Sequence, residues 1–360
     1  MLTTNDQRLF IIPCIRASTK TRSLPSVHKA TDVRLGRIVR LLMSHATVVV
    51  SGTKVAEELG TSRSEVWRLI QQLRGLGVDV AGHPATGYQL RAVPDLLLPE
   101  MLAPSLKGTL FGNAKFIHHY YKIGSTNSEA MRAAADGVSE GNVFLAEEQL
   151  SGRGRGAHTW ESARSEGIYC SVILRPNLPP SDALIFSLAA GLAVRAAVVE
   201  IAPQLPVDLK WPNDLLLGNK KFCGILTEMN AEATRVNHLV VGIGINVNQT
   251  KFPAELRDIA SSLRIATRTE WSRVELCAAL LKSLDREYRA LTEDASARAA
   301  IIRRFEESSS SVRGRKVSVE ETPSLSGVSE GLDERGFLQI RTADGLRTVM
   351  SGTVRIGGSV

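Results

Sequence analysis

The residues best suited to chemistry begin in the segment SGRGRGAHTW, which runs from Ser151 to Trp160. Arg153 and Arg155 alternate with glycines there, and the closing tryptophan offers a flat face for a purine. Glycine lets a backbone approach a ligand closely, whereas arginine brings a fixed charge and donors that match a carboxylate or a phosphate. We therefore expect an anion-binding flap over a pocket, although a surface loop or a nucleic-acid contact would give the same pattern.

A second group of candidate residues lies in LKWPNDLLLGNKKFCGILTE, residues 209–228. Lys210 ends an apolar strand, and its ammonium is expected to point inward, where a developing negative charge could use it. Asn213 and the aspartate after it are typical turn residues. The pair Lys220 and Lys221 is interpreted as two solvated lysines. The segment therefore contributes Lys210 as its catalytic candidate.

Alternating strands and helices must position these residues. The segment STNSEAMRAAADG predicts a helix with a serine or threonine cap, and HLVVGIGINVN predicts a buried strand whose glycines allow close approach of another group. Strands mixed with helices indicate an α+β sheet domain. The expected elements are a helix at 125–137, strands at 142–149, 167–176 and 238–248, and a long buried helix at 182–202.

The N-terminal part has a different pattern. Apolar residues recur at helical spacing in 33–43, and short helices at 52–60 and 61–77 precede an alternating hairpin. This layout is typical of a winged helix-turn-helix, with a three-helix bundle as the alternative. Residues 1–95 hold 13 basic and 7 acidic side chains, which favours DNA binding. The residues expected to enter the major groove are Ser62, Arg63, Ser64, Trp67 and Arg68.

The whole chain is thus predicted to be a multidomain α+β protein. Residues 1–30 are expected to form a poorly ordered extension, 31–93 the winged helix-turn-helix, 96–308 a central mixed-sheet domain and 311–360 a small β-barrel of short alternating strands.

Composition excludes several classes. The net charge is +7, and Cys14, Cys170, Cys223 and Cys277 are too far apart in the sequence to suggest a disulfide framework or a zinc site. No uncharged run reaches the length of a membrane span, and no signal-peptide pattern is present, so a soluble cytoplasmic protein with no membrane partner is expected. The motifs of P-loop ATPases, zincins and α/β-hydrolases are absent.

In their order along the chain, STN, GRGR, KWPND, KKFCGILTE, GIGINVN and SGTVRI resemble the bifunctional biotin protein ligases from about Val33 to the C-terminus. The resemblance implies a winged helix-turn-helix, a class II synthetase-like ligase domain and an SH3-like barrel. It also implies that biotin and ATP form biotinoyl-5′-AMP. The biotin then passes to a lysine of the biotin carboxyl carrier protein of acetyl-CoA carboxylase. The further implied partners are operator DNA, Mg²⁺ with ATP through ligands that the sequence does not identify, and a ligand-promoted homodimer.

The resemblance assigns roles residue by residue. Arg153, Arg155 and Lys210 would be catalytic. The adenylate would contact Trp160, Asn213 and Asn246. The biotin site would consist of Ser125, Thr126, Asn127, Gln149, Arg153, Gly154, Arg155, Lys210, Gly242 and Gly244.

One departure from the family pattern concerns the loop. The family loop reads GRGRRGR, whereas this chain has Gly156, Ala157 and His158 at its last three places. Fewer basic side chains predict looser retention of the adenylate. Two other functions remain open: a biotin-sensing transcription factor with weak or no ligase activity, and a lipoate ligase.

Overall fold

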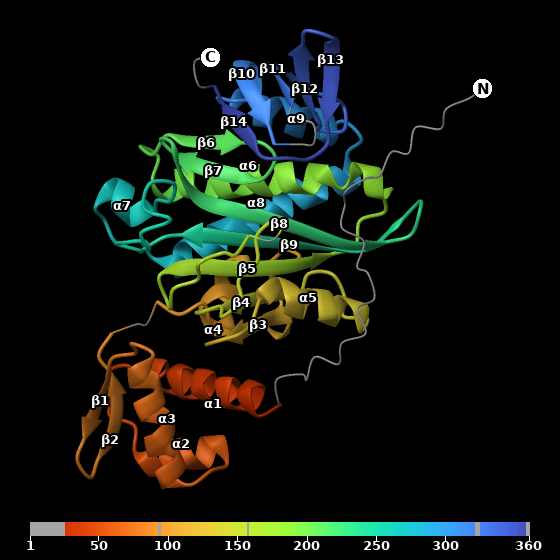
Figure 1. Cartoon of the computed structure of the whole chain (residues 1–360). Coiled ribbons are helices and arrows are strands. Elements are labelled where there is room, and N and C mark those ends of the chain that lie inside the picture. The colour runs from red at the N-terminus through yellow and green to blue at the C-terminus, as the bar shows by residue number, and fades with distance from the viewer. Residues whose placement is uncertain (1–25, 93–94, 157, 321–324, 358–360) are drawn as a thin grey trace.

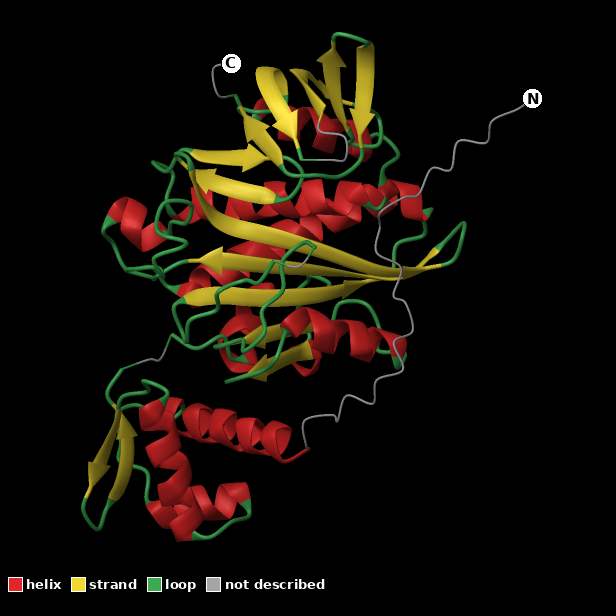
Figure 2. Cartoon of the chain, viewed as in Figure 1, coloured by secondary structure: helices red, strands yellow, loops and turns green. Residues whose placement is uncertain are grey.

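The computed structural model of the chain describes residues 26–92, 95–156, 158–320 and 325–357, which form three parts (Figure 1). Helices and one hairpin make up the first part at one end of the molecule. A large sheet with helices on both faces occupies the middle, and a small sheet lies at the other end (Figure 2). The predicted α+β architecture of three successive parts is confirmed.

The first part is the predicted helix-turn-helix with a hairpin. Ser51 and Ser62 cap the second and third helices by accepting the backbone N–H groups of Lys54 and Glu65. Gly60 ends the second helix at a φ of +62°. The apolar faces of all three helices pack into one core. The elements are α1 (Ser26–Met43), α2 (Gly52–Leu59), α3 (Arg63–Gly75), β1 (Val80–His83) and β2 (Gly87–Leu90).

The first helix begins earlier than predicted. The sequence placed residues 1–30 in an extension, but α1 begins at Ser26. Residues 26–32 hold only two apolar residues, Val27 and Ala30, and the dense helical periodicity that predicts a helix starts at Val33. Residues 1–25 lie outside the described residues.

A seven-stranded sheet forms the middle of the molecule, in the order β3-β4-β5-β9-β8-β7-β6. The β3–β4 pair is parallel and all other neighbours are antiparallel. The strands are β3 (Ile117–Tyr120), β4 (Val143–Ala146), β5 (Gly167–Leu174), β6 (Val207–Lys210), β7 (Asp214–Leu217), β8 (Lys220–Ala231) and β9 (Val236–Asn246). The helices are α4 (Pro99–Leu102), α5 (Thr126–Ala135), α6 (Leu184–Ile201), α7 (Leu263–Thr267), α8 (Arg273–Glu293) and α9 (Ala297–Glu307), with short 3-10 helices η1 (Ala103–Leu106), η2 (Ala114–Phe116) and η3 (Pro180–Asp182).

The two faces of this sheet carry different layers. Alternate residues of β9, such as Val241 and Ile243, belong to the core under α6 and α8. The residues between them face the other way, and Val240 packs with the alanines of α5. Gly242 and Gly244 lie on this α5 face, where the missing side chains leave room for a pocket.

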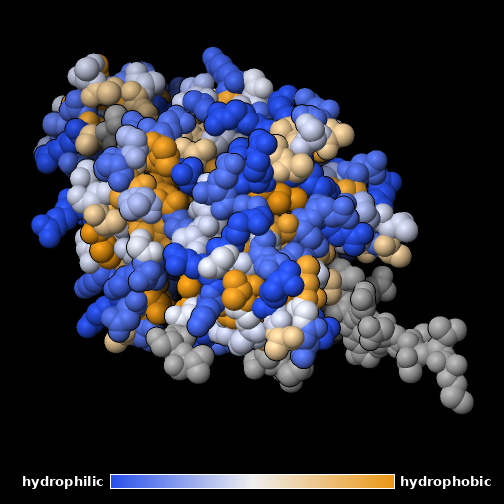
Figure 3. Space-filling model, turned by 90° about the horizontal axis from the view of Figure 1, so that it is seen from above, coloured by the Kyte–Doolittle hydropathy of each residue, from blue (hydrophilic) through white to orange (hydrophobic). Residues whose placement is uncertain are grey.

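One helix within the described residues, α6 with its preceding turn, is long and apolar enough to span a membrane. Most of it is buried in this structure, so we interpret it as the core helix of the central part. The face of the molecule seen in Figure 3 is largely hydrophilic, with apolar residues in small groups.

The last part is a five-stranded antiparallel sheet in the order β13-β12-β11-β10-β14. The strand number and pairing agree with the predicted small barrel, but no pairing joins β13 to β14 within the described residues, so closure stays a prediction. Trp211 Nε1 donates to the Gly336 carbonyl oxygen (2.9 Å) and connects this sheet to the central part. The strands are β10 (Arg313–Val319), β11 (Leu325–Leu332), β12 (Leu338–Thr342), β13 (Gly345–Val349) and β14 (Val354–Ile356).

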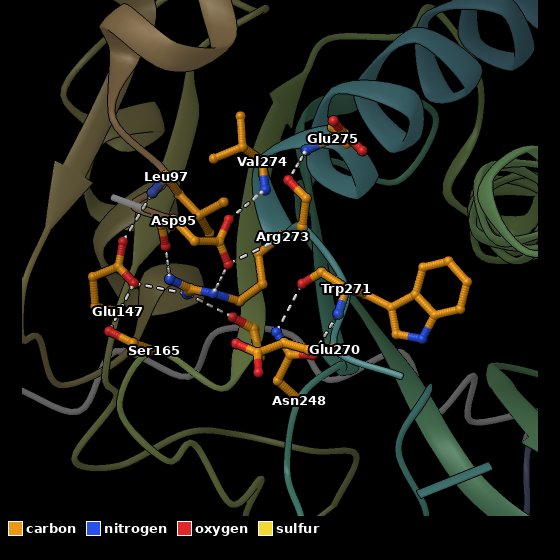
Figure 4. A network of polar contacts seen from close by, with 12 residues as sticks. Asp95, Leu97, Glu147, Ser165, Asn248, Glu270, Trp271, Arg273, Val274 and Glu275 are labelled. Carbon is orange, nitrogen blue, oxygen red and sulfur yellow. Dashed lines mark hydrogen bonds and ion pairs between the residues drawn. The ribbon is translucent and has the colours of Figure 1, made fainter. Parts of the chain in front are cut away.

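A buried ion pair of the central part also binds Asp95, which follows the first part (Figure 4). Arg273 Nη1 lies 2.7 Å from Glu147 Oε2, and both side chains are almost completely buried. Arg273 Nε also binds Asp95, which follows the winged helix (3.0 Å). The Glu147 oxygens are further contacted by Leu97 N, His119 Nε2 and Ser165 Oγ. Burial raises the pKa of Glu147, but the Arg273 charge and the His119 contact outweigh it and bring that pKa to about 2.

The hydrophobic core of the first part continues across this junction. Leu96, Leu98 and Tyr121 pack in the same cluster as the side chains of α1 and α3. Residues 95–98, which connect the two parts, are therefore fixed by both polar and apolar contacts.

Candidate functional site

An open cavity of about 450 Å³ lies on the α5 face of the sheet, beside the two glycines of β9. It is bounded by the start of α5, the arginine loop and the middle of β8. The lining residues are Ser125, Thr126, Asn127, Gln149, Arg153, Gly154, Arg155, Trp160, Tyr169, Cys170, Asn213, Lys221, Gly224, Ile225, Leu226, Gly242, Ile243 and Gly244. Most of the predicted site residues are thus brought together.

The first turn of α5 forms the polar end of this cavity. Ser125 caps the helix by accepting the Ser128 N–H (3.4 Å), which exposes the next residues at the cavity wall. Gln149 Oε1 accepts the backbone N–H of Thr126 (2.9 Å). Gln149 is held opposite α5 because it pairs with Ile123 in a parallel bridge that prolongs the β3–β4 pair. These backbone contacts place the two side chains together.

Asn127 is buried at the same end and has a partner for each of its polar atoms. Its Nδ2 donates to Leu226 O (3.2 Å) and Glu228 Oε2 (3.0 Å), and its Oδ1 accepts from the Ser171 hydroxyl (2.6 Å). A Cβ atom at Gly242 would lie 2.0 Å from Asn127 Oδ1. Only glycine therefore fits at this position of β9.

The arginine loop carries both guanidinium groups to the cavity. Arg153 makes a bidentate ion pair with Glu228 (2.9 and 3.2 Å). Arg155 Nη1 donates to Asn213 Oδ1 (3.2 Å) and to Gly352 O of the last part (3.4 Å). Burial lowers the pKa of Arg155, although an arginine remains charged at any ordinary pH. The loop thus holds two permanent cations over the α5 face.

Trp160 lies flat against the sheet. Cβ atoms placed at Gly224 and Gly244 would come within 2.9 and 2.6 Å of its ring, so two glycines facing each other on β8 and β9 make room for the indole. Trp160 Nε1 is buried and has no hydrogen-bond partner among the described residues. An unpaired donor of this kind is costly, and a ligand acceptor could satisfy it.

Lys221 is a site residue that the sequence reasoning missed. Its Nζ lies 2.6 Å from Asp214 Oδ1 and 5.4 Å from the centre of the Trp160 ring. A bulge places Leu216 opposite Lys221 and Leu215 opposite Cys223, so strict strand alternation is broken at Phe222. The bulge allows the Lys221 ammonium to reach the cavity face near Gly224. The sequence signal that could have identified Lys221 is the nearby Gly224, which faces Gly244 across the two strands.

The structure does not bring Lys210 to the cavity, where the sequence placed it. Lys210 ends β6, the edge strand, and does not line the cavity. It pairs in register with Asp214 on β7, whereas the cavity lies over β8 and β9. With about 4.8 Å between neighbouring strands, this edge position leaves Lys210 about 10 Å from β8. The KWPND turn places Asn213, not Lys210, at the site.

Asn246 also lies away from the cavity. Its Nδ2 donates to Ser261 O (3.1 Å), and its Oδ1 accepts from Gln249 Nε2 (3.3 Å). Because these bonds hold the segment that follows β9, Asn246 has a structural role here. The predicted adenylate contact of Asn246 is therefore not supported, whereas Asn213 and Trp160 do line the cavity.

The unusual end of the arginine loop is partly described. Gly156 has a φ of +63°, a conformation that favours glycine, and no atom would lie within 4 Å of a Cβ there. Ala157 lies outside the described residues. His158 holds the loop by its backbone, accepting the Gly154 N–H (2.8 Å).

A separate candidate site is the outer face of α3. Ser62 caps this helix, and the Ser62 and Ser64 hydroxyl oxygens lie 2.9 Å apart. Trp67 is 57% exposed, which is unusual for a large apolar side chain. Arg68 is held by Glu65 in a bidentate ion pair (2.7 and 2.8 Å), so it is less available than Arg63, for which no ion pair is present within the described residues.

No group of three or more metal-ligating side chains occurs in the described part of the chain. The carboxylates nearest the cavity, Asp214 and Glu228, are paired with Lys221 and Arg153. Chemically, the arrangement can bind anions: Arg155 contacts only neutral oxygens, Arg153 and Lys221 lie beside it in their ion pairs, and the far end of the cavity offers neutral hydrogen-bonding groups.

Comparison with known proteins supports three matching regions. Residues 34–89 match the HTH domain family, residues 123–246 the Biotin/lipoate A/B protein ligase family, and residues 313–357 the Biotin protein ligase C terminal domain family. These ranges follow the three parts of the structure.

Whole-chain relatives are similar across the same length. The Bifunctional ligase/repressor BirA of Bacillus spizizenii is 33% identical over 89% of this chain and 98% of its own, and that of Escherichia coli is 28% identical over 85% and 92%. Among solved structures, the biotin protein ligase from Aquifex aeolicus in complex with biotin and ATP has a TM-score of 0.58 and 31% identity, covering 68% of this chain and 99% of that one.

Proposed function

The chain belongs to the family of bifunctional biotin protein ligases, and from this premise we propose that it is an ATP-dependent biotin–[acetyl-CoA-carboxylase] ligase and a biotin-responsive repressor. The observation that carries the ligase proposal is the convergence of Arg153, Arg155 and Lys221 on one cavity with a neutral polar end. A carboxylate and a nucleotide phosphate repel each other, and such a cavity reduces that repulsion.

In the first half-reaction, a biotin carboxylate oxygen attacks the α-phosphorus of ATP, and the bond to pyrophosphate breaks. Arg153 and Arg155 neutralise the two reacting anions, and Lys221 stabilises the negative charge that develops on the phosphoryl oxygens. The catalytic lysine is thus Lys221 in place of Lys210.

In the second half-reaction, the amine of a carrier-protein lysine attacks the acyl carbon of biotinoyl-5′-AMP. An amide bond forms, AMP leaves with the bonding electrons, and the amine loses a proton to solvent or to AMP. The arginine loop excludes water from the mixed anhydride during this interval.

Biotin occupies the polar end of the cavity. Its ureido ring is proposed to meet Thr126, Asn127 and Gln149, with Ser125 at the rim and Gly242 leaving room for the bicycle. The adenine is proposed to lie beside Trp160 and Gly244, near Asn213. Mg²⁺ would arrive bound to the ATP phosphates, because the described residues around the cavity offer no carboxylate free of a cation.

The repressor function rests on the first part of the chain. Arg63, Ser64 and Trp67 are proposed to contact operator DNA, with Arg68 available once it leaves Glu65. A ligand-promoted homodimer and a cytoplasmic location remain predictions that follow from the family.

The decisive experiment incubates the purified chain with Mg-ATP, biotin and the apo carrier domain, followed by mass spectrometry of the carrier. Biotin on the carrier lysine, absent from a lysine-to-arginine carrier, is the expected result. Transfer of lipoate in place of biotin would identify a lipoate ligase. Failure of any transfer, together with a biotin-dependent gel shift on DNA, would identify a sensor without ligase activity.

For the repressor, the double change of Arg63 and Arg68 to alanine is expected to weaken DNA binding and reduce the slope of log K against log salt by about 2. Ligation should be unaffected, since both residues lie in the first part. Equal DNA affinity of the wild type and the double variant in a gel shift would contradict the proposal that α3 contacts DNA.

A further inference from the structure

Glu228 lies behind the polar end of the cavity and does not line it. Its carboxylate accepts from Arg153 and from Asn127 Nδ2. A carboxylate in a bidentate pair with an arginine can only accept hydrogen bonds. Glu228 therefore forms a fixed acceptor at one end of a chain of polar side chains.

That fixed end determines the direction of the next bonds. Because Asn127 must present its Nδ2 to Glu228 and Leu226 O, its Oδ1 must point to Ser171. Ser171 has one proton, and the 2.6 Å contact with Asn127 Oδ1 uses it. Thr126 Oγ1 lies 2.8 Å from Ser171 Oγ on the other side and competes with Asn127 Oδ1 for the same proton.

The hydroxyl protons can be assigned in the same way at the cavity wall, where Thr126 and Gln149 lie. The Thr126 hydroxyl has one proton and two neighbouring acceptors, Ser171 Oγ at 2.8 Å and Gln149 Oε1 at 3.1 Å. Two hydroxyl protons thus serve three contacts. Gln149 Oε1 has only the backbone N–H of Thr126 as a certain donor, and the Thr126 oxygen keeps a free lone pair. The cavity side of this chain therefore presents acceptors.

We propose that Glu228 is a positioning residue which sets the direction of this hydrogen-bond chain, so that the pocket presents acceptors and selects a ligand with two adjacent N–H donors, as in a cyclic urea. The proposal deepens the proposed biotin ligase function and rests on it. Glu228, although it lies outside the pocket, would therefore determine whether the pocket binds a ligand ring with N–H donors or one without them.

A reciprocal exchange of carboxylate and amide tests the direction of the chain. In N127D, two carboxylates face each other, so the KM for biotin in ATP–pyrophosphate exchange is expected to rise about 30-fold. In N127D/E228Q, the amide introduced at position 228 donates to the carboxylate introduced at position 127, which still accepts from Ser171, so the KM should recover at least tenfold relative to N127D. The single E228Q should raise KM less than about fivefold, because its amide oxygen can still accept from Asn127.

The control is E232Q, which removes a carboxylate further along the chain from the cavity and should leave KM unchanged. Thermal unfolding of each variant shows whether it is folded. If N127D does not fold, the double variant must both fold and bind biotin within about tenfold of the wild type. A double variant no better than N127D would overturn the proposal.

A second arm does not depend on these variants. A biotin analogue methylated on both ureido nitrogens retains the acceptor oxygen but has no N–H donors, and its KM in the wild type should be at least 100-fold above that of biotin. An analogue KM within threefold of that of biotin would overturn the proposal. Failure of the wild type to use biotin at all would instead refute the proposed function, so the two failures are distinguishable.

Discussion

Replacing Lys221 should test the site more sharply than any other single change. Lys221 and Lys210 are both lysines of the same segment, but only Lys221 lines the cavity, where Asp214 holds its ammonium at 2.6 Å. Lys221→Ala and Lys210→Ala therefore form a matched pair. Each removes one positive charge, and only one removes it from the site.

The magnitude follows from Coulomb's law. Two unit charges about 4 Å apart interact by about 4 kcal/mol at an effective dielectric constant of about 20. The Lys221 side chain is 35% exposed, so solvent screening reduces this to about 2 to 3 kcal/mol. A loss of that size at the transition state lowers kcat for adenylate formation about 30- to 150-fold. Lys210→Ala should change kcat less than threefold.

The assay is biotin-dependent ATP–pyrophosphate exchange, which isolates the first half-reaction. Thermal unfolding confirms that both variants are folded, and Lys221→Arg shows whether charge alone suffices. A larger loss of activity in Lys210→Ala than in Lys221→Ala would contradict the placement of Lys221, and not Lys210, at the reaction centre.

Three further outcomes are expected. Gly244→Ala should raise the KM for ATP about tenfold, because the added Cβ would lie 2.6 Å from the Trp160 ring. Gly75→Ala, where the added Cβ meets open space, should leave ligation unchanged. Equal KM values for the two variants would contradict the packing of Trp160 on Gly244. The pKa of Glu147 is lowered to about 2, so its contribution to the free energy of unfolding is complete above about pH 4.5 and is lost as the pH falls toward 2. Glu147→Gln should therefore remove about 3 kcal/mol of the change in unfolding free energy across that pH window, as measured by urea unfolding. An unchanged dependence on pH would contradict the low pKa of Glu147. His158→Arg should slow dissociation of the adenylate several-fold in a filter-binding assay, and is a cleaner test than Gly156→Arg because Gly156 has a φ of +63°; identical rates would remove the idea of looser retention.

Periodicity and capping residues allowed much of the fold to be predicted. The glycines of β9 and the serine before α5 marked the cavity floor and its polar end correctly. Helical periodicity placed the start of the first helix at about residue 31, whereas α1 begins at Ser26, where apolar residues are sparse in the sequence.

The choice between lysines could not be made from the sequence. Strand alternation distributes side chains correctly only in a regular ladder, and the bulge at Phe222 shifts Lys221 toward the cavity. Likewise, Lys210 and Asn246 each end an apolar strand next to candidate residues, but which strands are neighbours is a long-range property. Sheet order places Lys210 at the edge.

The docked connector bears on how DNA would be engaged. The Asp95 carboxylate accepts the backbone N–H groups of Arg273 and Val274 at the start of α8, and Leu97 is bound by Glu147. Leu96 and Leu98 also pack in the core of the first part, so the ligase body dictates where the recognition helix points. Two copies on one palindrome would then tolerate only one half-site separation, and about five inserted base pairs, half a turn of duplex, should abolish their joint binding.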